Sequence, residues 1–351
     1  MSIVGKLTAN DCELIESYIE TFGGPDGCST TLRAPLEHIL RFWGVNKEDL
    51  FHLFGDELIL AKSINVAKSA YELEDDIERN VLNYGGPGRT FFDAFWHWKS
   101  DAKIDTQFYW ELSSLTNSSS LASNIYSGNT FEIGTDSNHP IVVNAGCKIS
   151  KILGKIAKTF NLPGYEEFRI AHSQCLNQKY LRGELCLSIH PLDYMTMSDN
   201  NCDWDSCMSW QQPGDYRIGT VEMMNSPCIV VAYLRSSTDM NMPNGGTWNS
   251  KKWRQLFIVT PEMISGIRQY PYDNNELCGT ALKWLRSLAQ DNAHWGPYTD
   301  NAVKISNYDD NIVAEISEDP IKIHIHTRYM YNDFGRGHLS FLSKYHKYFL
   351  L

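Results

Sequence analysis

The apolar runs of this chain are short, and their length constrains the fold more than any other feature of the sequence. One of the longest, Cys228–Leu234, reads CIVVAYL and has the length of a buried strand. A membrane-spanning helix needs about 20 consecutive apolar residues. Further strand-like runs at Leu185–Ile189, Thr220–Met224 and Gln255–Val259 are separated by turn residues. The second half of the chain is therefore predicted to form a sheet, and no membrane partner is expected.

Helical periodicity is concentrated in the first hundred residues, where Asn10 or Asp11 is expected to cap the first helix. The predicted helices cover residues 8–22, 35–42, 47–82, 91–98, 148–160 and 276–289. The strands cluster late instead of alternating regularly with helices, so the fold class is predicted to be α+β. We expect a helical N-terminal region followed by a mixed, mainly antiparallel sheet domain with flanking helices.

A Ser/Asn-rich stretch, residues 113–129, is the clearest loop or linker in the chain. On either side of it the sequence predicts a mainly helical acidic region, 1–112, and a central α+β domain, 130–310. The C-terminal strands and tail, 311–351, are expected to pack on the central domain.

The chain carries a formal charge of −11, which argues against a protein that coats nucleic acid along its whole surface. The charge is uneven. Residues 1–100 hold nine Lys/Arg against sixteen Asp/Glu, whereas residues 148–182 hold seven against two. This basic island is a candidate surface for an anionic ligand. The alternative is a solvated helix face that offsets the acidic N-terminal region.

A second basic feature, Trp248–Arg254, reads WNSKKWR and interleaves aromatic and cationic side chains. Such residues stack bases and hold phosphates, although the same pattern also occurs where basic side chains extend along a strand entrance. If the cations of the middle of the chain converge, the central domain binds a nucleotide or a nucleic acid. The candidate binding residues are Lys179, Arg182, Arg217, Lys251, Lys252, Trp253 and Arg254.

The stretch 186–210 is the densest in polar and reactive side chains. One hypothesis makes Cys207 a nucleophile, with His190 or His172 as its base and Asp193 or Asp199 orienting the imidazole. No spacing rule links these residues. The alternative is that the aspartates form turns by capping local backbone N–H groups.

Nine cysteines, an odd number, together with an N-terminus lacking a secretory pattern, favour free thiols in a reducing compartment. A cytoplasmic location is therefore expected. Cys202 and Cys207 have no second pair at a matching spacing, so the sequence predicts neither a metal site nor a cofactor.

The run LSIHPLDYMTMSDNNCDWDSCMSW, followed by GDYRIGTVEMMNSPCIVVAYL and KKWRQLFIV, resembles a family of proteins encoded by bacteriophages and prophages of low-GC Gram-positive bacteria. The resemblance implies no activity and no catalytic residue. It implies a setting inside a bacterial host cell, in phage replication or counter-defence. Three functions stay open: binding of an anionic ligand, catalysis by Cys207, and action as an inhibitor or adaptor that binds a host protein through the acidic N-terminal region.

Overall fold

The computed structural model describes the side chains and backbone of most of the chain. The described residues are 6–23, 36–101, 147–198, 204, 206–211, 217–261, 263–293 and 295, with the strand backbones 131–133, 141–143, 304–308, 311–316, 321–326 and 341–343. They group into two compact units. The sheet unit comprises Met1–Asn65 and Arg182–Leu351, and the helical unit comprises Val66–Leu181. The domain boundaries predicted near residues 112, 129 and 310 fall outside the described residues and stay predictions.

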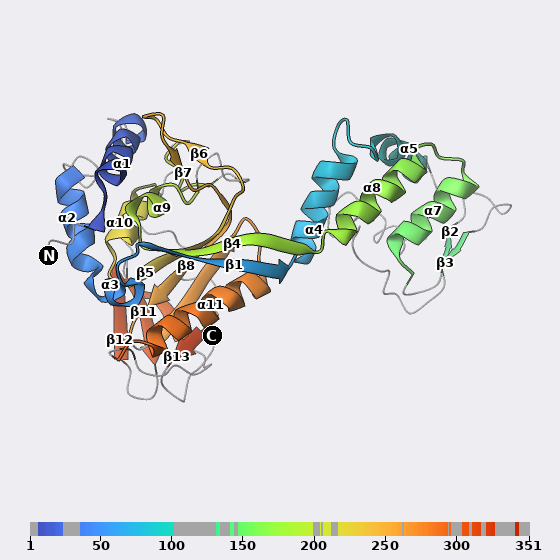
Figure 1. Ribbon diagram of the computed structural model, residues 1–351. Helices are drawn as coiled ribbons and strands as arrows, with labels where there is room; N and C mark the ends of the chain where they lie inside the picture. Colours follow the sequence, from blue (N-terminus) through green and yellow to red (C-terminus); the bar gives the residue numbers. More distant parts are fainter. Residues whose placement is uncertain are drawn as a thin grey trace. The chain divides into compact units, whose positions relative to one another are not determined.

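The sheet unit is built on a six-stranded sheet with the strand order β1-β4-β5-β8-β9-β13 (Figure 1). Neighbours from β4 to β13 pair antiparallel, which confirms the predicted α+β class with a mainly antiparallel sheet. The strands are β1 Ile59–Ala67, β4 Tyr180–Ser188, β5 Ile229–Arg235, β8 Lys251–Val259, β9 Met263–Tyr270 and β13 Phe341–Ser343. The predicted apolar run CIVVAYL supplies β5, whose residues are buried up to Leu234.

Helices pack around this sheet, and local capping explains where two of them begin. Thr8, not Asn10 or Asp11, is the N-cap of the first helix, and it forms a capping box with Asp11. Asn274 caps the last helix by accepting two backbone N–H groups. The helices are α1 Ala9–Phe22, α2 Leu36–Asn46, α3 Glu48–Phe54, α9 Pro191–Met195, α10 Arg217–Asn225 and α11 Asn275–Gln290. Of the helices that the structure describes, none combines the length and apolarity needed to cross a membrane.

Two predicted elements were wrong. The run Thr220–Met224, expected as a strand, lies inside α10, because a short apolar run does not distinguish a buried strand from a buried helix. The helical pattern predicted over 47–82 is interrupted by β1. This strand lies at the edge of the sheet and buries only Val66 fully, so it lacks the continuous apolar run of a central strand.

Two smaller antiparallel sheets also belong to the sheet unit. β6 (Met240–Asn241) and β7 (Thr247–Trp248) form a hairpin, and Gly245 between them has φ +84°. A residue with a side chain is strained at that backbone angle, which accounts for glycine there. β10 (Lys304–Tyr308), β11 (Asn311–Ile316) and β12 (Ile321–His326) form a three-stranded antiparallel sheet.

The helical unit surrounds its own apolar core. Its elements are α4 Ala70–Ile77, the π-helical turn η2 Glu78–Leu82, α5 Arg89–Asp101, β2 Phe131–Ile133, β3 Ile141–Val143, α7 Ile149–Thr159 and α8 Tyr165–Asn177. The helix predicted over residues 148–160 is confirmed as α7, and its apolar residues Ile149, Ile152, Leu153 and Ile156 are buried in this core. Phe168 of α8 packs into the same cluster.

Two glycines allow α8 to lie close to α5 and to α7. Gly164, with φ +74°, forms the turn before α8, and a Cβ there would lie 2.9 Å from the Phe91 backbone nitrogen. A Cβ on Gly154 would lie 2.5 Å from the Tyr165 hydroxyl oxygen. Because that space is free, the Tyr165 hydroxyl donates to the Ser150 carbonyl at 2.9 Å and fixes the start of α8 against the start of α7.

Candidate functional site

The segment after β4 is held by hydrogen bonds around His190. The Ser188 hydroxyl accepts from the His190 backbone N–H at 3.0 Å, and the imidazole Nδ1 accepts from the Leu192 N–H at 3.2 Å. His190 is therefore the N-cap of α9, and Pro191 occupies the first turn, where a missing N–H costs little. In the neutral imidazole, the proton consequently lies on Nε2.

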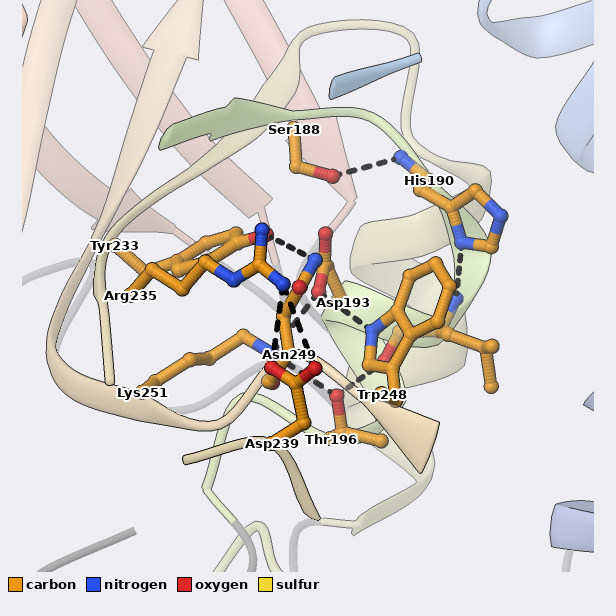
Figure 2. A network of polar contacts seen from close by, with 11 residues as sticks. Ser188, His190, Asp193, Thr196, Tyr233, Arg235, Asp239, Trp248, Asn249 and Lys251 are labelled. Carbon is orange, nitrogen blue, oxygen red and sulfur yellow. Dashed lines mark hydrogen bonds and ion pairs between the residues drawn. The ribbon is translucent and has the colours of Figure 1, made fainter. Parts of the chain in front are cut away.

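Asp193 of α9 forms an ion pair with Lys251 at the start of β8, as Figure 2 shows. Lys251 Nζ lies 2.9 Å from Asp193 Oδ1, and both side chains are 0% exposed. The Trp248 indole N–H donates to the same oxygen at 2.8 Å. A buried carboxylate is tolerated when it has both a counter-charge and hydrogen bonds, and Asp193 has both.

Lys251 also contacts neutral groups (Figure 2). Its Nζ donates to Thr196 Oγ1 at 3.1 Å and to the Asn249 carbonyl at 3.0 Å, and it lies 4.6 Å from the centre of the Tyr233 ring. Burial raises the pKa of Asp193, but the charges of Lys251 and His190 outweigh it and hold that pKa below its ordinary value. Asp193 and Lys251 thus form a buried ion pair in which each charge neutralises the other.

His190 also joins this network to α1. Its Nε2 lies 3.4 Å from Asp11 Oδ1, and its ring centre lies 4.5 Å from that of Trp248. Burial raises the pKa of Asp11, but its polar contacts with His190 and Thr8 outweigh it and lower the pKa to about 2. The imidazole Nδ1 thus accepts a hydrogen bond, whereas Nε2 lies beside the Asp11 carboxylate without one among the described residues.

The structure does not assemble the hypothetical Cys207 machinery from the residues it describes. Cys207 is partly exposed, and among the described residues no hydrogen bond joins it to His190 or Asp193. His172, the other candidate base, belongs to the helical unit, and Asp199 lies outside the described residues. What the structure brings together instead is His190, Asp193 and Lys251.

The rest of the predicted basic patch on β8 is mostly packed inside the sheet unit. The Trp253 indole donates to Gln269 Oε1 at 3.1 Å, and Trp253 is fully buried. The Arg254 guanidinium lies 4.3 Å from the Tyr270 ring centre, and Arg254 is only 2% exposed. Lys252 is the exposed residue of this strand.

The remaining predicted binding residues are dispersed in the sequence and in their contacts. Arg217 donates to the Phe22 carbonyl at 3.3 Å. Arg182 is exposed on β4 in the sheet unit, and Lys179 is exposed in the helical unit. None of the seven predicted residues lines the cavity described next.

That cavity lies in the helical unit, where the N-terminal turn of α7 meets one face of α8. Its volume is about 620 Å³. It is lined by Cys147, Lys148, Ser150, Lys151, Tyr165, Arg169, His172, Ser173 and Leu176. Three of these side chains are permanent cations near neutral pH, and none of these lining residues is acidic. The lining of the cavity therefore carries a net positive charge.

The cations of the cavity differ in how far they are already neutralised. The Arg169 Nε donates to Glu166 Oε2 at 2.9 Å, and this hydrogen bond lowers the pKa of Glu166. Lys148 and Lys151 are exposed and have no carboxylate partner among the described residues. The two lysines thus supply most of the unbalanced charge.

The N-terminus of α7 adds to this charge. Lys148 is its N-cap and makes no side-chain capping bond, and the first turn of α7, all of which is described, holds no acidic residue. The first N–H groups of a helix lack intrahelical acceptors, and the helix dipole favours an anion near them. The start of α7 consequently favours an anion at the same end of the helix as the cavity.

Sequence reasoning found part of this site. Lys148, Lys151 and Arg169 belong to the basic island predicted as an anion surface. Cys147 was missed, and His172 was considered only as a base for Cys207. One signal in the sequence was available. The spacing i, i+3, i+4 and i+7 places four cavity residues on the same face of α8, namely Arg169, His172, Ser173 and Leu176.

Known proteins add nothing to this geometry. No family model, no curated protein and no solved structure matches the chain. Among the described residues, no group of three or more His, Cys, Asp or Glu side chains is arranged to hold a metal ion.

Proposed function

We propose that the protein binds a phosphate-bearing ligand, a nucleotide or a nucleic acid, in the cavity between α7 and α8. One observation carries this proposal: Lys148, Lys151 and Arg169 border a single cavity of about 620 Å³ whose described lining holds no acidic side chain. A volume in this range suits a small organic ligand. Phosphate carries the charge and the acceptor oxygens that such a lining would bind.

The chemistry of the lining favours phosphate over a simple carboxylate. A phosphate group presents several acceptor oxygens, and the cavity offers the α7 N-terminus, two lysines and the hydroxyls of Ser150 and Ser173. Tyr165 and Leu176 supply apolar surface for the organic part of the ligand.

The biological setting is part of the same proposal. The resemblance to phage and prophage proteins would place this binding in the cytoplasm of a bacterial host cell, in phage replication or counter-defence. Free thiols agree with a reducing compartment, and the described cysteines are free.

The proposal is tested by calorimetric titration of the full chain with adenosine monophosphate and diphosphate, with adenosine as the matched ligand lacking phosphate. We expect the nucleotides to bind with a dissociation constant below about 1 mM, the diphosphate more tightly, and adenosine not detectably. The affinity should fall as salt rises from about 50 mM to about 200 mM. Binding of adenosine as tight as that of the nucleotides would overturn the proposal.

A further inference from the structure

α7 presents a continuous row of lysines on its solvent-facing side. Lys148, Lys151, Lys155 and Lys158 are all exposed and recur at i, i+3, i+7 and i+10. At 100° per residue they fall within an arc of about 80°, and at 1.5 Å per residue they extend over about 15 Å. We call these four residues the lysine row. The opposite side of α7 is buried in the core.

The lysine row and the cavity are continuous. Lys148 and Lys151 belong to both, whereas Lys155 and Lys158 lie further along α7 and do not line the cavity. A ligand that fills the cavity would therefore leave half of the row unused. A longer polyanion would use all of it.

We propose that the ligand is a single-stranded nucleic acid whose terminal phosphate enters the cavity and whose backbone follows the lysine row. This inference rests on the function proposed above and names its ligand class. Successive lysines of the row are about 4.5–6 Å apart along the helix axis, which suits the repeated charges of an extended strand.

The surface of α7 argues against a membrane as the polyanion. A helix that lies in a membrane interface needs an exposed apolar face, but the apolar side chains of α7, among them Ile152 and Ile156, are buried in the protein core. Thr159 is the other exposed residue of the helix besides lysines. An acidic peptide is the remaining polyanion, and the test includes it.

The experiment measures fluorescence anisotropy of a labelled decanucleotide that carries a phosphate at its 5′ end, at its 3′ end or at neither end. Adenosine monophosphate and an oligoglutamate of equal charge are the competitors. We expect a phosphate at one end to tighten binding at least threefold. The oligonucleotide should bind at least tenfold more tightly than the mononucleotide and the oligoglutamate.

A variant that changes the lysine row outside the cavity, Lys155→Gln with Lys158→Gln, isolates the backbone contacts. Its binding to the decanucleotide should weaken at least fivefold, and the slope of log K against log salt should become shallower by about 1.4. Its affinity for adenosine monophosphate should be unchanged. The matched control, Lys252→Gln with Lys283→Gln, alters two exposed lysines of the sheet unit and should leave both affinities unchanged.

The outcomes separate this inference from the proposed function. If the mononucleotide binds but the row variant and the end phosphates make no difference, the ligand is a small molecule and the inference is overturned. Equal binding of oligoglutamate would also overturn it, in favour of an acidic peptide. If neither nucleotide nor oligonucleotide binds, the proposed function fails as well. Circular dichroism of each variant verifies folding.

Discussion

Replacement of Lys251 by alanine is expected to lower the free energy of unfolding by about 3–5 kcal/mol. The substitution leaves the Asp193 carboxylate buried at 0% exposure with the Trp248 indole as its main donor. An uncompensated buried charge is costly, whereas an exposed lysine contributes little. Urea denaturation followed by circular dichroism measures the change through the midpoint at constant slope.

Lys252→Ala is the matched control, because Lys252 is the exposed neighbour of Lys251 on the same strand. Its free energy of unfolding should stay within about 0.5 kcal/mol of the parent protein. Removing both charges, as in Lys251→Met with Asp193→Leu, should cost less than Lys251→Ala alone. A loss below about 1 kcal/mol for Lys251→Ala would contradict a buried ion pair.

Reversing two charges in the cavity, Lys148→Glu with Lys151→Glu, is expected to weaken nucleotide binding about 100-fold, or about 2.7 kcal/mol. The variant replaces the two cations that have no described carboxylate partner with anions beside the α7 N-terminus. The two introduced carboxylates repel the phosphate of the ligand, and this repulsion opposes the attraction of the α7 helix dipole for it. Calorimetric titration with adenosine diphosphate measures the loss.

The control for this prediction carries the same change in total charge. Lys252→Glu with Lys283→Glu makes the chain equally more negative at exposed positions of the sheet unit. If binding depends on charge within the cavity, this control retains most of the affinity. An equal loss in both variants would show that total charge, and not the cavity, governs the interaction.

The sequence predicted the elements whose patterns are strong and local. α7 followed from its apolar stripe and α11 from its periodicity, while β5 followed from CIVVAYL. It failed for β1 and for Thr220–Met224, where burial is set by the position of a segment in the fold. Tertiary packing outweighs local preference at such positions.

The sites were predictable only in part, because their residues come from distant segments. The sequence singled out both His190–Asp193 and Lys251, and the structure brings them together. It could not show that Lys251 is buried and neutralised by Asp193, since that depends on packing between α9 and β8. The cavity depends on the pairing of α7 with α8 through Gly154 and Tyr165, and no local sequence pattern predicts that contact.

The polar network of the sheet unit connects helices and strands of that unit to one another. His190 contacts Asp11 of α1, and Asp193 contacts Trp248 of β7 and Lys251 of β8. Within it, the charges of Asp193 and Lys251 balance one another. The unbalanced positive charge of the cavity, by contrast, has no such partner among the described residues, and this difference decides which region is proposed to bind a ligand.

The most direct test of the proposed cavity uses Cys147, which lines it, with the partly exposed Cys207 of the sheet unit as an internal reference. Iodoacetamide labelling of each thiol is followed by peptide mass spectrometry, with and without saturating adenosine diphosphate. Ligand bound in the cavity covers Cys147, so its labelling should slow at least fivefold while that of Cys207 is unchanged. Nucleotide binding that leaves the labelling rate of Cys147 unaltered would contradict the account.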